Sequence, residues 1–259
     1  MTTLSIQSLY AAPYGTPLLE NIDLELEAGQ VLGVIGPNGA GKSSLLHCIA
    51  GGLPAKSGRI LFDGSSLEAL TSQRRARCTA MQVQHSALNF PFSVEEVILL
   101  GRTPHASGQR RDRLILNEVM LATDTADLAH RPYTQLSGGE KQRVQLARAV
   151  AQVWREEDAS HRLLLLDEPN SALDLSHQRM VLEVVRQMAA TGCTVLMATH
   201  DFNLLSPHAD RLLVMQNGKQ YGYGTPEEVL RASMFKEVFA VDVSIQQRPG
   251  SMAPLVIHQ

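Results

Sequence analysis

Three short hydrophobic runs along the chain predict buried β-strands. They cover residues 31–36, 163–167 and 194–199 and are rich in valine, leucine and isoleucine. Continuous apolar runs without polar alternation are typical of strands covered on both faces. A helical pattern over about 176–190 separates the last two runs. Strand, helix and strand in this order predict a parallel α/β core.

Glycine and proline positions mark further elements of this core. Residues 42–51 predict a helix ended by a pair of glycines. Residues 211–224 predict a β-hairpin, because an Asn-Gly pair at 217–218 favours a tight hairpin turn. Another helix is expected to begin at Pro226, with Thr225 as its N-cap.

The middle of the chain has a different pattern, with helical spacing and few strand signals over residues 86–154. Ser93 and Glu96 have the spacing of a capping box at a helix start. Residues 107–113 are polar and basic, and we expect a solvated loop there. We therefore expect a helical subdomain inserted into the α/β core. The expected division is 1–85 and 155–234 for the core, 86–154 for the helical subdomain and 235–259 for an irregular or strand-like tail.

Composition narrows the class of protein. The 259 residues are enough for one large α/β domain or for a core with a subdomain. A net charge of −3 argues against a nucleic-acid partner, because nucleic-acid binders are usually basic. No apolar stretch approaches the ~20 residues that span a bilayer, and no signal-peptide pattern is present. Any action at a membrane would therefore require docking onto another chain.

The three cysteines carry no sign of metal or disulfide chemistry. Cys48, Cys78 and Cys193 are far apart and lack the close pairing of metal ligands. We expect each to be a small buried hydrophobic side chain, as in a protein of the reducing cytosol.

The segment GPNGAGKS matches the phosphate-binding loop G-x-x-x-x-G-K-[ST] in full, between a predicted strand and a predicted helix. Glycines allow backbone N–H groups to surround phosphate oxygens, and the lysine supplies a compact cation. The serine hydroxyl can ligate Mg²⁺. The alternative is a glycine-rich turn without a ligand, which the complete motif disfavours. The residues expected to hold ATP here are Gly36, Pro37, Asn38, Gly39, Ala40, Gly41, Lys42, Ser43 and Ser44.

Polar residues at the ends of the other two predicted strands complete a candidate hydrolytic site. Asp167 ends one strand and could reach Mg²⁺, and Glu168 follows it and could orient or deprotonate a water molecule. His200 ends the next strand, and parallel sheets place their sites at the carboxyl ends of strands. Taken alone, each could be a surface acid or a structural histidine. Beside a complete phosphate-binding loop, the functional interpretation is favoured.

A second phosphate-binding element is predicted far along the chain. The segment LSGGEKQRVQLARAV, residues 136–150, begins as a Ser-Gly-Gly turn and continues as a helix. A helix N-terminus is an anion-binding site. With this segment the sequence resembles the ATPases of the ABC family. The other matching motifs are Gln84 as the Q-loop glutamine, Asp167-Glu168-Pro169 as the Walker B motif, SALD at 171–174 as the D-loop, and His200 as the switch histidine.

The resemblance, which extends over about residues 4–230, implies a fold and an assembly. The implied fold is a P-loop NTPase (RecA-like) α/β core with an inserted α-helical subdomain and an N-terminal antiparallel β part. Two copies would pack head to tail as a homodimer, each ATP lying between one chain's P-loop and the other's signature segment. The signature side of the site would comprise Ser137, Gly138, Gly139, Glu140 and the D-loop residue Asp174. The implied catalytic residues are Glu168, His200 and Gln84, and the implied Mg²⁺ ligands are Ser43, Gln84 and Asp167.

An aromatic residue before the P-loop usually stacks on adenine in this family. Tyr14 is the first candidate and Tyr10 the second, while a core tyrosine is the alternative for either.

In more detail the chain resembles the ATP-binding subunits of bacterial haem importers, on segments such as QHSALNFPFSVEEVILLGR and SALDLSHQ. Val83 and Asn170 depart from that pattern, where a proline and a small hydroxyl residue are expected. The resemblance implies an importer ATPase, peripheral on the cytoplasmic face of the inner membrane. Its expected partners are two membrane-spanning permease subunits, contacted near residues 84–92, and indirectly a periplasmic substrate-binding protein. Phe90 and Phe92 could line that contact or could instead anchor the core of the helical subdomain.

Three alternatives stay open from the sequence. Ferric-siderophore or cobalamin import would use the same motifs. An ABC ATPase acting on DNA or ribosomes usually has tandem cassettes, long coiled coils or basic surfaces, which this chain lacks. A P-loop kinase has no need of the LSGGE and SALD segments.

Overall fold

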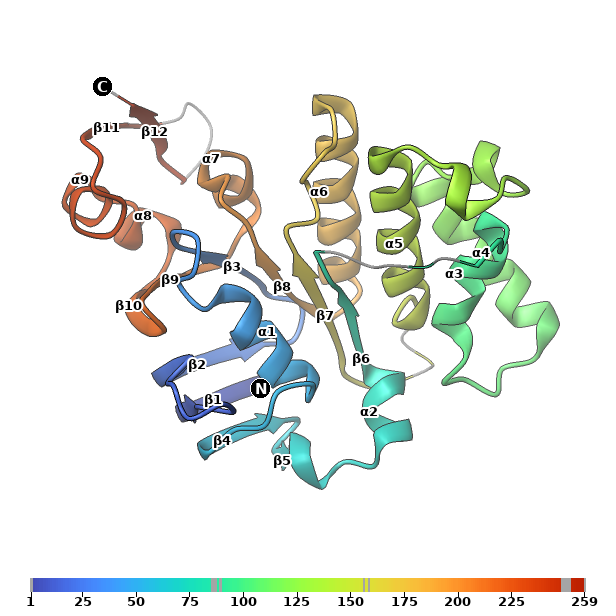
Figure 1. Cartoon of the computed structure of the whole chain (residues 1–259), viewed down its shortest axis with the longest axis horizontal. Helices are drawn as coiled ribbons and strands as arrows, with labels where there is room; N and C mark the ends of the chain where they lie inside the picture. The colour runs from blue at the N-terminus through green and yellow to red at the C-terminus, as the bar shows by residue number, and fades with distance from the viewer. Residues whose placement is uncertain are drawn as a thin grey trace.

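The computed structural model describes residues 2–84, 88, 90–155, 157, 159–247 and 253–258. Most of its strands form one large mixed sheet (Figure 1). These strands are β1 (Thr2–Ala11), β2 (Leu19–Glu27), β3 (Val31–Ile35), β4 (Ser57–Phe62), β5 (Ser65–Ser66), β6 (Thr79–Gln82), β7 (Arg162–Asp167), β8 (Cys193–Ala198), β9 (Arg211–Gln216) and β10 (Lys219–Gly224). Their order across the sheet is β5-β4-β1-β2-β10-β9-β3-β8-β7-β6.

Several helices pack against this sheet, and α3 and α4 pack against α5. They are α1 (Lys42–Ala50), α2 (Ser72–Cys78), α3 (Val94–Leu99), α4 (Gln109–Ala122), α5 (Gly138–Gln152), α6 (Leu175–Ala190), α7 (Phe202–Leu205), α8 (Pro226–Val229) and α9 (Ala232–Met234). Figure 1 shows α3, α4 and α5 at one end of the molecule, away from β1, β2 and β4.

The parallel half of the sheet consists of β6, β7, β8, β3 and β9. It confirms the three predicted strands, and every residue of β3, β7 and β8 is buried. Alternate side chains of β7 belong to two different hydrophobic clusters, one on each face of the sheet. Leu163 and Leu165 pack with α1, whereas Leu164 and Leu166 pack with α5 and α6. Helices on both faces explain why these strands are hydrophobic throughout.

The N-terminal strands form the antiparallel half, in which β1 pairs with both β2 and β4. Hydrophobic and charged residues alternate along β2. Ile22, Leu24 and Leu26 are buried, while Glu25 and Glu27 are exposed. A strand with one covered face has this pattern. The expected fold class, a P-loop NTPase core with an N-terminal antiparallel β part, is confirmed.

Helices α3, α4 and α5 lie between β6 and β7 in the chain, within the region expected to be helical. The capping box of Ser93 and Glu96 is present at the start of α3. The expectation of a loop over 107–113 is wrong from Gln109 onward, because α4 begins there. Asp112 in its first turn accepts hydrogen bonds from Arg102 and Ser107, which stabilise the helix start. The boundaries of the helical subdomain remain a prediction.

The predicted hairpin of β9 and β10 is confirmed, with Asn217 and Gly218 in left-handed conformations at its turn. The tail differs in part from expectation. Residues Phe235–Phe239 form a π-helical turn instead of an irregular or extended segment. The ring of Phe235 is fully buried, 4.8 Å from the ring of Phe202, so packing decides this local structure. Beyond it, β11 (Val243–Gln246) and β12 (Leu255–His258) pair as strands.

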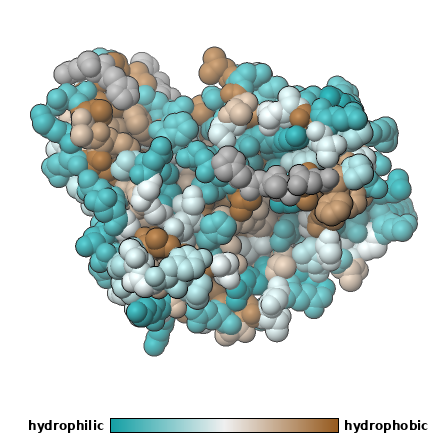
Figure 2. Space-filling model, in the orientation of Figure 1, coloured by the Kyte–Doolittle hydropathy of each residue, from teal (hydrophilic) through white to brown (hydrophobic). Residues whose placement is uncertain are grey.

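The surface is mixed in character, and the cysteines lie beneath it. On the face shown in Figure 2, hydrophobic side chains occur in small scattered groups among hydrophilic ones. Cys48, Cys78 and Cys193 are free and buried, as predicted. Among the described residues, no helix combines the length and hydrophobicity that crossing a bilayer requires.

Candidate nucleotide-binding site

The loop between β3 and α1 has the backbone shape of a phosphate cradle. Gly36 has a φ of 155°, and a Cβ atom at this position would lie 2.3 Å from the carbonyl oxygen of Met215. Gly41 precedes α1 with a φ of 101° and caps it without a side-chain hydrogen bond. The first turn of α1 contains no acidic residue. Its N–H groups are therefore available to an anion.

Lys42 is held across this loop. Its side chain is buried, and Nζ donates to the carbonyl oxygens of Gly36 at 2.8 Å and Pro37 at 3.1 Å. Burial lowers the pKa of Lys42, and the nearby Glu168 and Asp167 carboxylates partly oppose that shift. An ammonium group has three hydrogens. With two of them on carbonyls, one is left to bind a phosphate oxygen.

Asp167 lies at the carboxyl end of β7 and is buried. Burial raises the pKa of Asp167, and a hydrogen bond with the Ser43 side chain opposes the shift. Its Oδ1 atom has no hydrogen-bond partner among the described residues. A buried carboxylate oxygen beside a serine hydroxyl fits the oxygen ligands that Mg²⁺ requires. These two residues are therefore compatible with the predicted metal role.

Glu168 adopts a left-handed conformation, with a φ of 48°. This turn aims its carboxylate at the other predicted catalytic side chains. Nε2 of Gln84 donates to Oε2 of Glu168 at 2.9 Å, and Nδ1 of His200 lies 3.8 Å from Oε1. The three side chains follow β6, β7 and β8, so the parallel sheet brings them together at one edge.

One open pocket of about 990 Å³ joins the P-loop to these side chains. It is lined by Pro17, Leu18, Asn38, Gly39, Ala40, Gly41, Lys42, Ser43, Ser44, Gln84, Glu168, His200, Asn217 and Gly218. Sequence reasoning missed the first two and the last two of these residues. The pair at 217–218 was identified only as a hairpin turn. Its position in the pocket depends on tertiary pairing, in which Gly218 N donates to Ala40 O at 3.0 Å.

The signature residues are not among the described residues that line this pocket. Ser137 is the N-cap of α5 and forms a capping box with Glu140. Glu140 also pairs with Arg131 at 2.7 Å. The hydrogen bonds from Ser137, first its backbone N–H and then its side chain, lower the pKa of Glu140 to about 2, so Glu140 is a carboxylate at neutral pH.

Gly138, Gly139 and Asp174 complete the predicted signature side. The two glycines form the first turn of α5. Asp174 is the N-cap of α6 and accepts a hydrogen bond from the backbone N–H of His177. The two predicted phosphate grips are the P-loop at 36–43 and the start of α5 at 137–139. They are separate regions of one chain, because only the first lines the nucleotide pocket among the described residues.

Tyr14, Phe90 and Phe92 are exposed, whereas Tyr10 is half-buried. The Tyr14 side chain is 87% exposed, which excludes a core role, and it belongs to the same loop as Pro17 and Leu18 of the pocket. Tyr10 is half-buried within β1. Phe90 is 66% and Phe92 38% exposed, so neither is buried in the core of the helical region. Part of the expected permease contact, residues 85–87 and 89, lies outside the described residues.

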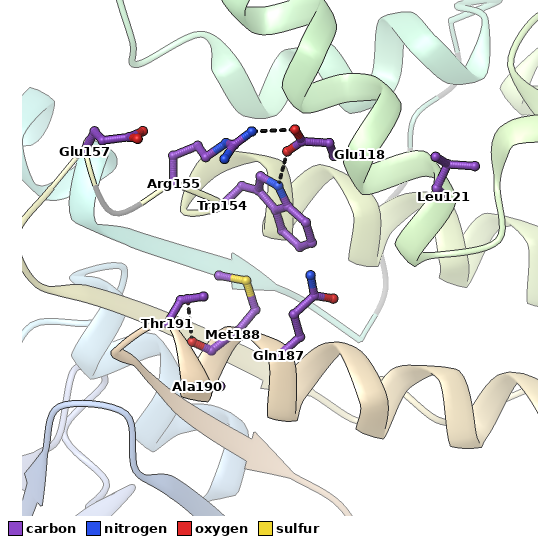
Figure 3. A pocket seen from close by; sticks show the side chains of 9 residues that line it. All are labelled: Glu118, Leu121, Trp154, Arg155, Glu157, Gln187, Met188, Ala190 and Thr191. Atoms are coloured by element: carbon purple, nitrogen blue, oxygen red, sulfur yellow. Dashed lines mark hydrogen bonds and ion pairs between the residues drawn. The ribbon is translucent and has the colours of Figure 1, made fainter.

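A second cavity, of about 630 Å³, shares no residue with the nucleotide pocket (Figure 3). It lies between α4, the segment after α5 and the end of α6. Glu118 accepts hydrogen bonds there from Trp154 Nε1, at 2.7 Å, and from Arg155. The buried Arg162 side chain donates to the carbonyl oxygens of Trp154 and Thr191. These bonds connect the helical region to the core, and the cavity contains none of the predicted site residues.

Comparisons with known proteins identify the family of this chain. The sequence model of the ABC transporter family matches residues 19–171. The chain is 46% identical, over 98% of its length and 99% of the relative's, to the hemin import ATP-binding protein HmuV of Pseudomonas entomophila. It is 45% identical to the protein of the same name from Gloeobacter violaceus, over 94% of this chain and 89% of that protein.

Solved structures show the same architecture. One is described as the inward-facing conformation of a metal-chelate type ABC transporter. It matches 100% of this chain and 97% of its own, with a TM-score of 0.80 and 26% identity. An ATP-binding subunit of an ABC transporter also has a TM-score of 0.80, at 22% identity over 92% of this chain and 98% of its own, which supports the fold alone. The chain belongs to the ABC transporter family, as an ATP-binding subunit that hydrolyses ATP.

Proposed function

We propose that this chain is the energy-coupling ATPase of a haem importer. The pocket that joins the P-loop to Gln84, Glu168 and His200 is the observation that carries the ATPase role. Similarity to hemin import ATP-binding proteins over nearly the whole chain supports haem as the cargo. Haem itself would pass through the membrane subunits, so this chain needs no haem site.

In this proposal, the loop and first turn of α1 bind the phosphates of ATP, and Lys42 neutralises their β- and γ-oxygens. Ser43, Asp167 and Gln84 would hold Mg²⁺, which would supply positive charge near the transferring phosphoryl group. Glu168 deprotonates or orients the attacking water molecule, and His200 bonds the γ-phosphate or holds that water. Tyr14 stacks on adenine.

The chain acts as a head-to-tail homodimer. The two phosphate grips of one chain are separate in the fold, so each completes a site with the opposite grip of another copy. Ser137 and the amides of Gly138 and Gly139 would contact the γ-phosphate from the far side. ATP would favour the closed dimer and hydrolysis would allow it to open, because ADP lacks the bridging phosphate.

The dimer docks on two membrane-spanning permease subunits at the cytoplasmic face of the inner membrane. Phe90 and Phe92 support this contact, because exposed apolar side chains often mark partner surfaces. Their ring centroids are 6.0 Å apart, so they form one small apolar surface, a few residues after Gln84 in the chain. A permease helix seated there would transmit its movement to the residue that bonds Glu168.

The decisive experiment measures ATP hydrolysis by the reconstituted transporter, with the permease and the binding protein present. We expect the binding protein loaded with haem to raise ATPase activity severalfold over the empty binding protein. Cobalamin and a ferric siderophore are the matched alternative cargoes. Stimulation by either of them, and not by haem, would reject the haem assignment and favour the broader metal-chelate class. An absence of ATP hydrolysis with every cargo would reject the ATPase role as well.

A further inference from the structure

The backbone carbonyl group of Glu168 accepts a hydrogen bond from a side chain of α5, the signature helix, which begins with the residues of the signature segment. Nε2 of Gln142 donates to the Glu168 carbonyl oxygen at 3.0 Å and lies 3.4 Å from Oγ of Ser171. Gln142 belongs to the second turn of α5, whose N-terminus carries Ser137. Gln142 and Glu168 are 26 residues apart in the chain, so this bond is a tertiary contact between α5 and the turn after β7.

Glu168 requires such support because of its backbone conformation. A left-handed φ in a residue with a side chain costs on the order of 1 kcal/mol and persists only where surrounding contacts hold it. Its N–H donates to Ala198 O at 2.9 Å, and its carbonyl also accepts hydrogen bonds from the hydroxyl and N–H groups of Ser171. The Ser171 bonds are local to the turn. The hydrogen bond from Gln142 therefore connects this turn to α5.

Gln142 is itself anchored to the core. Its carbonyl oxygen accepts a 3.5 Å hydrogen bond from Nε2 of Gln82, which is buried at the end of β6. Close by, a Cβ atom on Gly139 would lie only 3.1 Å from the carbonyl oxygen of Ala172 in the D-loop. The start of α5 is thus packed directly against the segment that follows Glu168.

We propose that Gln142 is a positioning residue for ATP hydrolysis, which holds Glu168 in its left-handed conformation and links it to the signature helix. The proposal rests on the proposed role of Glu168 at the attacking water. Its consequence concerns the dimer. The helix that grips the ATP bound to the other copy also holds the catalytic acid of its own site. Closure on one nucleotide is therefore transmitted to the geometry of the second site through one side-chain amide.

The test compares three substitutions on the same helix in the full-length chain. Gln142→Met keeps the length of the side chain and removes the N–H donor. Gln142→Glu replaces the donor by a carboxylate that faces a carbonyl oxygen. Gln152→Met is the matched control, since Gln152 also donates to backbone carbonyls, those of Ala76 and Thr79, at the far end of α5. For each variant, kcat and KM for ATP, the Kd of a non-hydrolysable ATP analogue and the Tm are measured.

We expect Gln142→Met to lower kcat about tenfold, which corresponds to an activation free energy about 1.4 kcal/mol higher. Gln142→Glu should lower kcat further. In both, the analogue Kd should stay within twofold of that of Gln152→Met. If kcat of Gln142→Met is within twofold of the control, Gln142 does not position Glu168. If the loss of kcat in Gln142→Met is accompanied by a lower Tm and a weaker analogue affinity than in Gln152→Met, the role of Gln142 is structural and the proposal fails.

A fourth variant, Glu168→Gln, separates this inference from the proposed function. It should bind ATP and lose nearly all turnover. Full activity in Glu168→Gln would remove the catalytic role of Glu168 and with it the basis of both proposals. An inactive Glu168→Gln beside an unaffected Gln142→Met would reject only the positioning role of Gln142.

Discussion

The two helix N-termini that the sequence marks as phosphate grips are built differently. The start of α1 has no side-chain cap and no acidic residue in its first turn, and Lys42 lies beside it. The start of α5 is closed by the capping box of Ser137 and Glu140, with Arg131 paired to that carboxylate. The first is therefore open to an anion in a single chain. The second already carries the Glu140 carboxylate, which makes it less favourable for an anion in a single chain.

In the proposed dimer, this difference would give α1 the capture of ATP and α5 the ATP-dependent association of the two copies. A helix N-terminus favours negative charge by about 0.3–1 kcal/mol, which the Glu140 carboxylate offsets locally. In the proposed dimer, a weak second grip would allow the two copies to separate after hydrolysis.

Substitution at the open grip, the uncapped start of α1, should have the largest effect. Lys42→Ala removes the buried cation beside the phosphates, and we expect ATP binding by the single chain to weaken by about 100-fold or more. Isothermal titration with ATP measures this directly. Lys141→Ala, at the start of the other grip, is the matched control and should leave that affinity unchanged. Equal losses in both variants would contradict the division of roles.

Substitution at the capped grip, the start of α5, should separate ATP binding by the single chain from ATP-driven dimerisation. Ser137→Arg places a large side chain where the partner's γ-phosphate is expected. We predict that ATP binding by the single chain changes by less than about threefold, because α1 supplies that affinity. ATP-driven dimers should disappear in sedimentation experiments. Dimers that still form with ATP would show that α5 is not the second grip.

Removing the negative charge of the capped grip should strengthen it. Glutamine can keep the capping box, so Glu140→Gln should lower the ATP concentration required for dimerisation by roughly two- to fivefold. Arg131→Gln leaves the carboxylate without its cation and should shift that concentration in the opposite direction. Shifts of the same sign in both variants would show that charge does not set the strength of this grip.

The smallest effect concerns acid stability. The pKa of Glu140 is about 2 in the folded chain, against an ordinary value of 4.5. A lowered carboxyl pKa stabilises the fold above the unfolded pKa, and the stabilisation is lost as pH falls. The Tm of Glu140→Gln should therefore be about 1–3 °C below that of the original chain at pH 7. The gap should shrink from about pH 4.5 toward pH 2. A constant gap over that range would exclude the capping carboxylate as its cause.

Much of the site could be predicted from short segments, because each motif encodes local backbone geometry. The P-loop glycines predict a cradle, and the strand ends at Asp167 and His200 predict a common edge of a parallel sheet. The capping pair Ser93 and Glu96 predicts a helix start for the same reason. The structure agrees with all three features.

Other features could not be predicted, because they depend on contacts between distant segments. The hairpin turn at 217–218 lines the nucleotide pocket only because β10 pairs with β2 beside the P-loop. Exposure distinguishes Tyr14 from a core residue, and the distance of Tyr14 from the P-loop along the chain carries no information about that exposure. The start of α4 at Gln109 depends on Arg102 and Ser107 reaching Asp112.

The sequence by itself determined the chemistry of this protein: a phosphate cradle, acids and a histidine at strand ends, and a second helix N-terminus. Backbone conformation and local hydrogen bonding are properties of neighbouring residues, so motifs are sufficient to predict them. Only the tertiary structure decided how these parts communicate. The bond between Gln142 and Glu168 joins a helix to a strand end in space, and the geometry of the fold alone places its two atoms 3.0 Å apart.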